Sequence, residues 1–566
     1  MKKHIVIFCV LTGLLSNSQQ KYPQNYFSNP LNIPLLLSGT FGELRSNHFH
    51  AGIDIKTQDK EGLPVFAVAE GYISRIKISQ YGYGKVIYIT HPNGYTTVYG
   101  HLQKYSEKIQ KHVKSVQYEK ECYETGNLFF KKQHFPIKKG EQIGVSGNTG
   151  GSGGPHLHFE IRKTQTSSVV NPLFFGFSVK DLIKPTVQAV RAYPLQKDAR
   201  INNKNTSLLL SLKKISDGKY KTEKIYASNS IGFAIQTFDR LNNANNRNGI
   251  YSIEMLVNNK SVFLHKMETF SFTESKFINL HIDYPYYKRY KKRFERTHKL
   301  IPNTLSTYHN LIDNGHLTVK NGFNYNVKIV VKDFTGNTSS VLIPVIGTTN
   351  NTIISSIDNK AYKLEAKKFQ KFSKKGVTVA FPKNTFYKDT HIDFSVDKKT
   401  VTVHQDVIPL DKSYTLTFDM SNYTEKEKQF LYIAKHLSDE YSYYVNTRKR
   451  DSTFFTTTKT LGKYGLRKDT IQPTIKPLYF KENQDLTKHK TLKVKIKDNG
   501  SGVKNYRATL NDEWILMEYD HKNGELTYDF KDKKLFGNQH IFKIVVADNV
   551  GNTKTLSVPF YKKPVN

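Results

Sequence analysis

The chain has 566 residues, enough for about three to four domains. Its 85 lysines and arginines outnumber 48 aspartates and glutamates, and the formal net charge of +37 draws such a surface to polyanions. Downstream of the N-terminal segment no stretch approaches the roughly 18 apolar residues of a membrane-spanning helix, so we expect no integral membrane segment. Cys9 lies in the apolar N-terminal run, which leaves Cys122 alone in the mature chain and predicts no internal disulfide.

The N-terminus has the features of a secretory signal peptide at residues 1–18. Lys2 and Lys3 precede an apolar run at residues 5–15, and small residues surround the expected cleavage point. We therefore expect an exported protein, either periplasmic or secreted to the cell envelope. An exported chain meets anionic cell-envelope polymers before nucleic acid, so we expect those polymers and not nucleic acid as partners of this charge. The alternative is a generally lysine-rich composition without a partner, because the lysines are dispersed along the chain.

The first domain is expected at residues 19–175, with an extended lead-in at residues 19–33. Residues 35–162 alternate short apolar runs with Gly, Pro and Asn-Gly, a pattern typical of an all-β domain. The run at residues 85–89 is one example. Asn93-Gly94 separates it from a second alternating run and predicts a hairpin turn, because both residues tolerate positive φ. His91 is interpreted as a residue of this turn.

The histidines of the same segment indicate a metal site. His156 and His158 lie two residues apart in a strand-like run, so both side chains can point into one cleft. His50 and Asp54 form a second pair far upstream. A catalytic zinc takes three protein ligands and leaves a fourth position for water, which matches this upstream pair and one histidine of the close pair. The other histidine is then free for proton transfer.

Three motifs in this order resemble the lysostaphin/LytM-type zinc endopeptidases of family M23, which cut peptidoglycan peptides. They are His50-x-Gly-x-Asp54, then Val98-Tyr99-Gly100-His101-Leu102, then Gly147-Asn148-Thr149-Gly150 leading into Gly154-Pro155-His156-Leu157-His158-Phe159-Glu160. The resemblance covers roughly residues 34–165. It implies a compact antiparallel β-structure with a zinc cleft across one sheet.

Carried over to this chain, the resemblance makes His50, Asp54 and His158 the ligands of one Zn²⁺. It makes His101 and His156 the unligated catalytic pair. His156 is the expected general base, and His101 is expected to stabilise the oxyanion or to orient the substrate. The resemblance leaves open that these two roles are exchanged.

The chain departs from the family pattern at two places. Ser152-Gly153-Gly154-Pro155 stands where the family usually has Ser-Thr-Gly-Pro, which removes a hydroxyl and loosens the loop. Residues 103–135 form a connection much longer than usual, and we expect it beside the cleft as a lid, as a substrate-binding wall or as a loop without consequence. His48 is expected to be structural, with substrate binding as the alternative.

Two downstream segments, residues 180–347 and 469–566, repeat one order of signals, and each is interpreted as an immunoglobulin-like β-sandwich. Both start with Asp-x-Ile-x-Pro-Thr and end with Asp-x-x-Gly-Asn. The aspartates of the second motif, Asp333 and Asp548, are expected to form turns, with Ca²⁺ binding as the alternative. The first copy is longer, which predicts an insertion at residues 283–314. Residues 349–467 are interpreted as a third accessory β domain.

Together these features predict an exported zinc metalloendopeptidase that hydrolyses peptide bonds in the stem peptides or cross-links of peptidoglycan. The alternative is a non-catalytic wall-binding regulator of other peptidoglycan hydrolases, because some relatives keep the fold and lose ligands. A surface adhesin with a vestigial peptidase accounts for the accessory domains but not for an intact site. All the implied ligands and both catalytic histidines are present, which favours the enzyme. The oligomeric state is not predicted.

Overall fold

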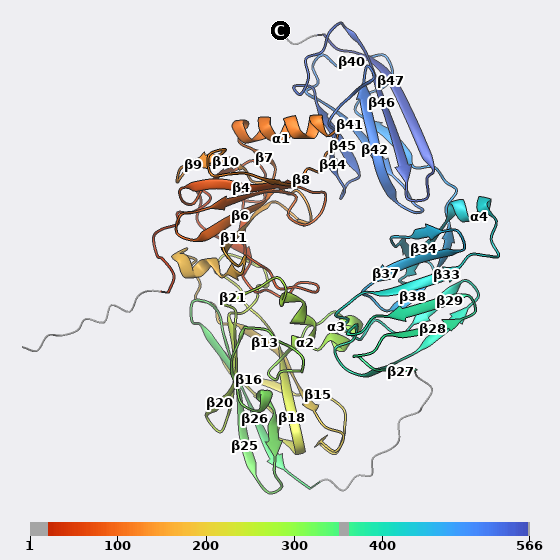
Figure 1. The fold of residues 1–566 in the computed structure, drawn as a ribbon. Helices are drawn as coiled ribbons and strands as arrows, with labels where there is room; N and C mark the ends of the chain where they lie inside the picture. The colour runs from red at the N-terminus through yellow and green to blue at the C-terminus, as the bar shows by residue number, and fades with distance from the viewer. Residues whose placement is uncertain (1–20, 350–361, 564–566) are drawn as a thin grey trace, which may run out of the picture.

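The computed structural model describes residues 21–349 and 362–563, and the expected signal peptide lies outside them. Strands dominate these residues, which confirms the all-β prediction (Figure 1). None of the helices in the described ranges is long and apolar enough to cross a membrane. The α-helices described are α1 (Glu107–Glu119), α2 (Ile278–His281), α3 (Tyr284–Tyr290) and α4 (Glu425–Phe430).

The first domain (residues 21–175) is built on one antiparallel sheet. Its main path runs in the order β1 (Leu37–Gly39), β2 (Ile53–Lys56), β11 (His156–Lys163), β6 (Tyr95–Leu102), β5 (Lys85–Thr90), β4 (Gly71–Ile78) and β8 (Gly126–Phe129). A small sheet, β3 (Pro64–Phe66), β10 (Gln142–Val145) and β7 (Lys104–Tyr105), lies beside it. β5 and β6 pair as the predicted hairpin, with Gly94 at φ 84°. Ile53, Ile87 and Phe159 belong to one buried core, which fixes the strands that carry the site.

The long connection at residues 103–135 folds into regular structure. It contributes β7, α1 and β8, and β8 pairs with β4 at the end of the main sheet path. α1 buries Ile109 and Val113 against the core, because side chains four residues apart lie on one helix face. The rest of the α1 surface does not pack on this core, so another domain can contact it.

The second domain (residues 180–347) holds the largest sheet. Its main path is β15 (Leu208–Leu210), β13 (Thr186–Pro194), β18 (Ile225–Phe238), β26 (Thr338–Gly347), β25 (Asn324–Lys332), β19 (Ser252–Val257), β20 (Lys260–Lys266) and β23 (Tyr308–Leu311). The segment predicted as an insertion contains α3, β22 (Glu295–Arg296) and β23. β12 (Val169–Val170) of the first domain pairs with β21 (Thr269–Phe270), so the two domains are joined by backbone hydrogen bonds.

The third domain has two five-stranded sheets and a two-stranded one, β27 (Tyr362–Leu364) with β30 (Thr390–Ile392), and the terminal domain has two sheets; each domain is built around one core. The third domain (residues 362–467) has β28 (Gln370–Lys374), β29 (Val377–Phe381), β33 (Tyr414–Asp419), β37 (Thr453–Thr458) and β36 (Arg448–Arg450) in one sheet, and β31 (Phe394–Asp397), β32 (Thr400–Val403), β38 (Gly462–Lys468), β34 (Leu431–His436) and β35 (Ser442–Tyr444) in the other. The terminal domain (residues 469–563) has β39 (Thr474–Leu478), β41 (Thr491–Lys497), β45 (Glu525–Asp529) and β44 (Glu518–Asp520) in one, and β40 (Gln484–Asp485), β47 (Thr553–Tyr561), β46 (Gln539–Asp548), β42 (Val503–Leu510) and β43 (Glu513–Trp514) in the other.

The two repeated Asp-x-x-Gly-Asn motifs form the predicted turns. Asp333 Oδ1 accepts the backbone N–H groups of Gly336 and Asn337 at 2.7 and 2.9 Å. Asp548 Oδ1 accepts the corresponding groups of Gly551 and Asn552 at the same distances. Each aspartate also lies in a group of three carboxylates, the residue type of the Ca²⁺ alternative: Asp181, Asp239 and Asp333 in one, Asp469, Asp498 and Asp548 in the other.

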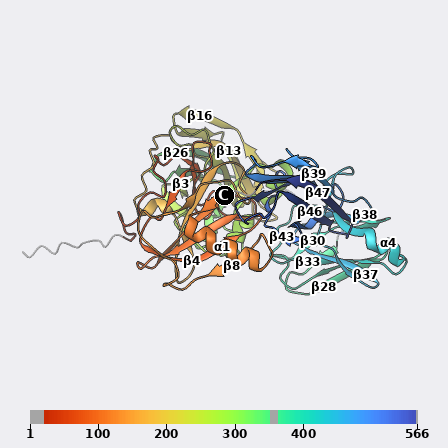
Figure 2. The same ribbon diagram turned by 90° about the horizontal axis from the view of Figure 1, so that it is seen from above.

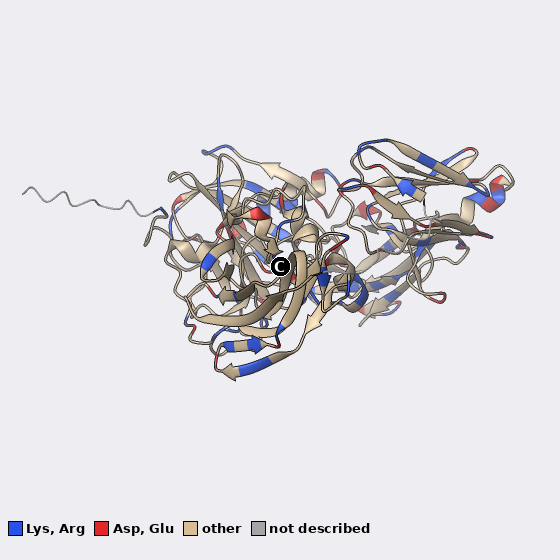
Figure 3. Ribbon diagram, turned by 90° about the horizontal axis from the view of Figure 1, so that it is seen from below, with Lys and Arg blue, Asp and Glu red and all other residues tan. Residues whose placement is uncertain are grey.

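The domain order brings the end of the chain back to its beginning. In Figure 1 the terminal domain lies next to α1, and Figure 2 shows the first and second domains on one side and the third and terminal domains on the other. Lys114 of α1 forms an ion pair with Asp532, and the rings of Tyr118 and Trp514 meet edge to face at 5.2 Å. Lysines and arginines are scattered over the domains in Figure 3, so the net charge is not concentrated in one block.

Candidate metal and catalytic site

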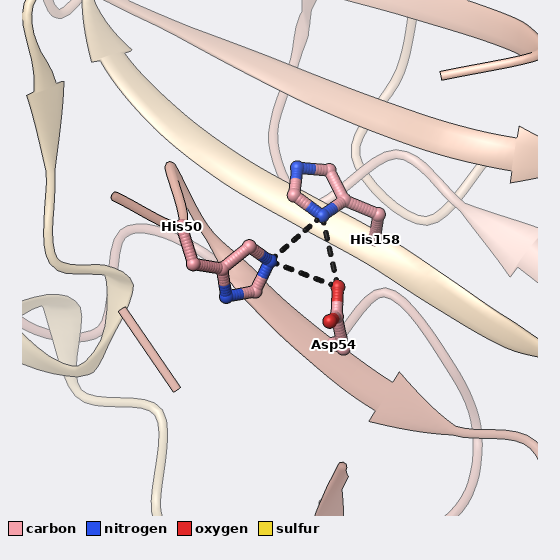
Figure 4. A group of neighbouring side chains, drawn as sticks. All are labelled: His50, Asp54 and His158. Atoms are coloured by element: carbon pink, nitrogen blue, oxygen red, sulfur yellow. Dashed lines mark hydrogen bonds and ion pairs between the residues drawn. The ribbon is translucent and has the colours of Figure 1, made fainter. Parts of the chain in front are cut away.

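Three buried donor atoms converge between β2 and β11. His50 Nε2 lies 3.0 Å from Asp54 Oδ1 and 3.1 Å from His158 Nδ1, and His158 Nδ1 lies 2.9 Å from Asp54 Oδ1 (Figure 4). The three side chains are each less than a tenth exposed. The residues implied as metal ligands by the sequence are therefore brought together, although His158 lies more than 100 positions after His50 and Asp54.

Strand register produces this convergence. His158 of β11 pairs directly with Asp54 of β2, so the two side chains leave adjacent strands on the same face. Gly52 lets the chain before β2 approach β11 closely, because a Cβ at this position would lie 2.2 Å from the carbonyl oxygen of Phe159. The glycine of His50-x-Gly-x-Asp54 is thus required by packing.

Hydrogen bonds on the outer side of each ring decide which nitrogen faces the site. His50 Nδ1 donates to the carbonyl oxygen of Thr40 at 2.8 Å, which leaves the Nε2 lone pair for a metal. His158 Nε2 donates to Glu160 Oε1 at 2.8 Å, which leaves Nδ1. Both outer partners are pure acceptors, so each ring carries its proton away from the converging atoms.

The electrostatics of the pocket favour a cation. Burial opposes the charged form of Asp54, but His50 and the hydrogen bonds of the neighbouring imidazoles hold the pKa of Asp54 well below its ordinary value. Burial likewise opposes a charged His158, whereas its hydrogen bonds to two carboxylates raise the pKa of His158 to about 9. The point where the donors meet therefore stabilises positive charge.

This donor set fits zinc. Two imidazole nitrogens and one carboxylate oxygen are ligands that Zn²⁺ takes, and ligand atoms at about 2.1 Å in a tetrahedral site lie about 3.4 Å from one another. The separations of 2.9 to 3.1 Å are slightly shorter than that value. The outer hydrogen bonds supply the orientation that metal-binding histidines need.

His101 and His156 stand beside the three donors. Their ring centroids are 4.8 Å apart, and His156 Nε2 lies 3.4 Å from Asp54 Oδ1. His101 Nδ1 lies 2.8 Å from the backbone carbonyl oxygen of Thr149. His156 Nδ1 lies 2.8 Å from the backbone carbonyl oxygen of Gly154. Burial lowers the pKa of His101 to about 3, so its ring is neutral. Both rings thus keep Nε2 available for proton transfer.

Hydrogen bonds of Ser152 hold the loop before β11, although its two glycines predict a looser loop. Ser152 Oγ donates to the carbonyl oxygen of Gly154 at 2.7 Å and lies 3.1 Å from His156 Nδ1. One hydroxyl of this loop therefore remains next to His156. His48 is exposed and bonds the carbonyl oxygen of Ser46. His91 is buried and bonds Glu70 O and Thr97 Oγ1, which agrees with a structural role for His91.

Three supporting residues were not identified as functional from the sequence. Arg45 Nη2 binds Asp54 Oδ2 at 3.0 Å, so it holds the second oxygen of the proposed ligand. Tyr83 donates to Glu160 Oε1 at 2.5 Å, and that carboxylate also pairs with Arg162. The sequence could have indicated Glu160, because it lies two residues after His158 on the same strand face. Arg45 and Tyr83 had none, since only the fold brings them to the site.

The terminal domain borders the site through β44, β45 and the turn between them. Lys522 in that turn donates to the carbonyl oxygens of Asn148 and Ser152, in the loop before β11. The ring of His521 packs on Tyr81 at 4.5 Å, and Glu518 pairs with the buried Lys85 at 2.8 Å. The insertion at residues 103–135 supports the same contact from α1, so it serves as a docking platform for the terminal domain.

Comparisons with known proteins agree with this geometry. Residues 48–127 and 120–172 match the profile of peptidase family M23, and residues 361–469 match that of a Zu5-like domain. An uncharacterized metalloprotease of Haemophilus influenzae is 33% identical over 124 residues, 22% of this chain and 20% of that protein. The DD-carboxypeptidase/endopeptidase Mpg of Neisseria meningitidis is 32% identical over 156 residues, 28% of this chain and 29% of that protein.

Among solved structures, the catalytic domain of lysostaphin from Staphylococcus simulans is 25% identical, with coverage of 25% of this chain and 90% of that one and a TM-score of 0.18. The chain matches less than a third of the length of either curated relative. The match to the peptidase profile begins just before His50 and ends after β12, so it contains the whole histidine and aspartate constellation. The residues that match the M23 profile are therefore those of the first domain that carry the site.

Proposed function

We propose that the protein is an exported zinc metalloendopeptidase that hydrolyses peptide bonds in peptidoglycan. The observation that carries the proposal is the convergence of three buried donors with two further imidazoles, each with Nε2 unoccupied by the backbone. His50, Asp54 and His158 would hold the metal. The substrate class is supported by Mpg, whose name describes a DD-carboxypeptidase/endopeptidase, and export is supported by the signal-peptide features of residues 1–18.

The chain's own residues account for binding and proton transfer. When bound, zinc supplies Lewis-acid chemistry and makes a hydroxide nucleophile available near neutral pH. His156 Nε2 takes a proton from the attacking water and returns it to the leaving amine. His101 is neutral, because its Nδ1–H is held by the carbonyl oxygen of Thr149 and burial disfavours a charged ring. Its Nε2 therefore accepts a hydrogen bond and orients the water or a substrate N–H.

The test is mass analysis of the peptides released from purified peptidoglycan by the full chain. We expect release that a chelator abolishes and added Zn²⁺ restores. The variant His156→Ala should keep its zinc and lose activity by about 10² to 10⁴-fold, the range for a general acid or base. The variant His48→Ala is the control, since His48 is an exposed neighbour of His50 outside the donor set.

A different result would favour the regulator. A chain that binds zinc, releases no peptides by itself and increases release by a second peptidoglycan hydrolase would overturn the enzymatic proposal. A chain whose His158→Ala variant binds as much zinc at the first-domain site as the wild type would overturn the ligand assignment.

A further inference from the structure

The second domain contains another group of metal-type donors, away from the peptidase site. His265 of β20, His281 at the end of α2 and Glu295 of β22 offer ligand atoms that all lie within 4.8 Å of one another. All three residues are buried, with exposed fractions of 2%, 0% and 7%. The group joins three segments of chain that are separate in sequence.

The hydrogen bonds of this group are incomplete. His281 Nε2 lies 3.2 Å from Glu295 Oε2, and its Nδ1 lies 3.0 Å from the hydroxyl of Tyr308. The Nε2 atom of His265 is buried and has no hydrogen-bond partner among the described residues. An unpaired buried polar atom costs about 1 to 3 kcal/mol, so this ring nitrogen needs a ligand that the chain does not supply.

The carboxylate of Glu295 also has little charge compensation. Among the described residues, the only ion-pair partner of Glu295 is His281, and the adjacent Arg296 instead binds the carbonyl oxygen of Ile282 and lies near Asp283. Buried carboxylates are normally paired with cations or coordinate metals. A divalent cation among the three donors would neutralise Glu295 and take up the free nitrogen of His265.

The outer contacts resemble those of a metal ligand. Tyr308 holds the outer nitrogen of His281 and itself accepts the side-chain amide of Asn303 at 3.0 Å. These hydrogen bonds orient the His281 ring so that its Nε2 faces the carboxylate of Glu295. Hydrogen bonds to the outer ring nitrogen orient zinc-binding histidines in the same way. The stacked rings of His265 and His281, with centroids 4.4 Å apart, place the second imidazole next to the first.

From these observations we propose a second zinc site in the second domain, with His265, His281 and Glu295 as ligands and a structural role. Two imidazoles and a carboxylate are a known zinc donor set, with a fourth position for water. The site would tie α2 and the segment predicted as an insertion to β20. It also lies behind the peptidase site, because the ring of His281 is 6.2 Å from that of Phe49, the residue before His50.

The experiment measures zinc by elemental analysis of the full chain after dialysis. We expect about two equivalents in the wild type and about one in His158→Ala, because the second donor set is complete without the first. His158→Ala combined with His265→Ala should retain none. The double variant of His158→Ala with His309→Ala is the matched control, since His309 is an exposed histidine of β23 next to Tyr308. About one equivalent in the wild type and none in His158→Ala would overturn the second site.

A second measurement guards against variants that fail to fold. In the His158→Ala background the conservative change Glu295→Gln keeps the size of the side chain and removes one anionic ligand. We expect it to lower zinc affinity by about 10- to 100-fold or more, while circular dichroism still shows the wild-type β signal. Cobalt added to the metal-free His158→Ala chain should give the visible absorption of a four-coordinate site. Unchanged zinc affinity in Glu295→Gln would overturn the ligand assignment. Neither readout depends on peptidase activity.

Discussion

The second and terminal domains repeat the same sequence signals, yet they contact the peptidase domain in different ways. The second domain shares a hydrophobic core with it. Phe41, Phe49 and Val169 of the first domain pack with Met267 and Phe270 of the second, and β12 and β21 continue one sheet across the boundary. A core of this kind does not separate without exposing apolar surface to water.

The terminal domain uses mostly charged and polar groups. Its contacts with the first domain include the ion pairs of Lys85 with Glu518, Lys114 with Asp532 and Glu121 with Arg507. Tyr118 against Trp514 adds an aromatic contact. Polar interfaces between domains are typical of reversible contacts, and their ion pairs weaken as salt rises.

The second domain thus contacts the first through a shared apolar core, whereas the terminal domain contacts it mainly through charged and polar groups. The second domain stabilises the loop that carries His50 from behind, through Phe49. The terminal domain reaches the loop before β11 from the solvent side, through Lys522. Three substitutions test this contrast, in order of expected effect.

The largest effect is expected for Phe270→Ala. Phe270 is 1% exposed, and its ring lies 5.1 Å from Phe41 and 5.6 Å from Phe49. Its truncation should lower the free energy of unfolding by about 3 to 5 kcal/mol, measured by urea denaturation. Phe323→Ala, at a ring that is 59% exposed in the same domain, is the control. Equal losses in the two variants would contradict a shared core.

An intermediate effect is expected for Lys114→Met. The change leaves Asp532, whose side chain is 3% exposed, without its cation. Loss of one partner from such a pair costs about 2 kcal/mol or more, which should release the terminal domain and increase the maximum dimension in small-angle X-ray scattering. Lys111→Met, an exposed lysine one turn earlier in α1, should leave the dimension unchanged. High salt should shift the wild type toward the released form, and insensitivity to salt would argue against a polar interface.

The smallest effect is expected for Lys522→Ala. It removes two hydrogen bonds to the loop that holds Ser152 beside His156. A loosened loop should lower kcat for peptide cleavage by about tenfold or less, because each such bond contributes about 0.5 to 1.5 kcal/mol. Zinc content should not change. The exposed Lys531, in the same domain, supplies the control variant Lys531→Ala. A rise in kcat would mean that the turn covers the cleft.

Features that depend on local pattern could be predicted from the amino-acid sequence. Alternating apolar residues and Asn-Gly predicted the β-hairpin of β5 and β6, because strand side chains alternate with period two. The same period placed His156 and His158 on one face of β11. Motif order then indicated which upstream residues belong with them, and the structure brings His50, Asp54 and His158 to one point.

Tertiary structure alone decided what depends on residues far apart in the chain. Arg45 at Asp54, Tyr83 at Glu160 and Lys522 at Ser152 carry no local signal, because their partners are set by strand register and domain docking. For the connection at residues 103–135 the sequence leaves open a lid, a substrate-binding wall or a loop without consequence. Its helix is held by burial of Ile109 and Val113 and by contacts with a domain about 400 residues later, which no local pattern indicates. His265, His281 and Glu295 are 30 residues apart at most and match no motif of the first domain; only the folding of the second domain around them makes them one donor set.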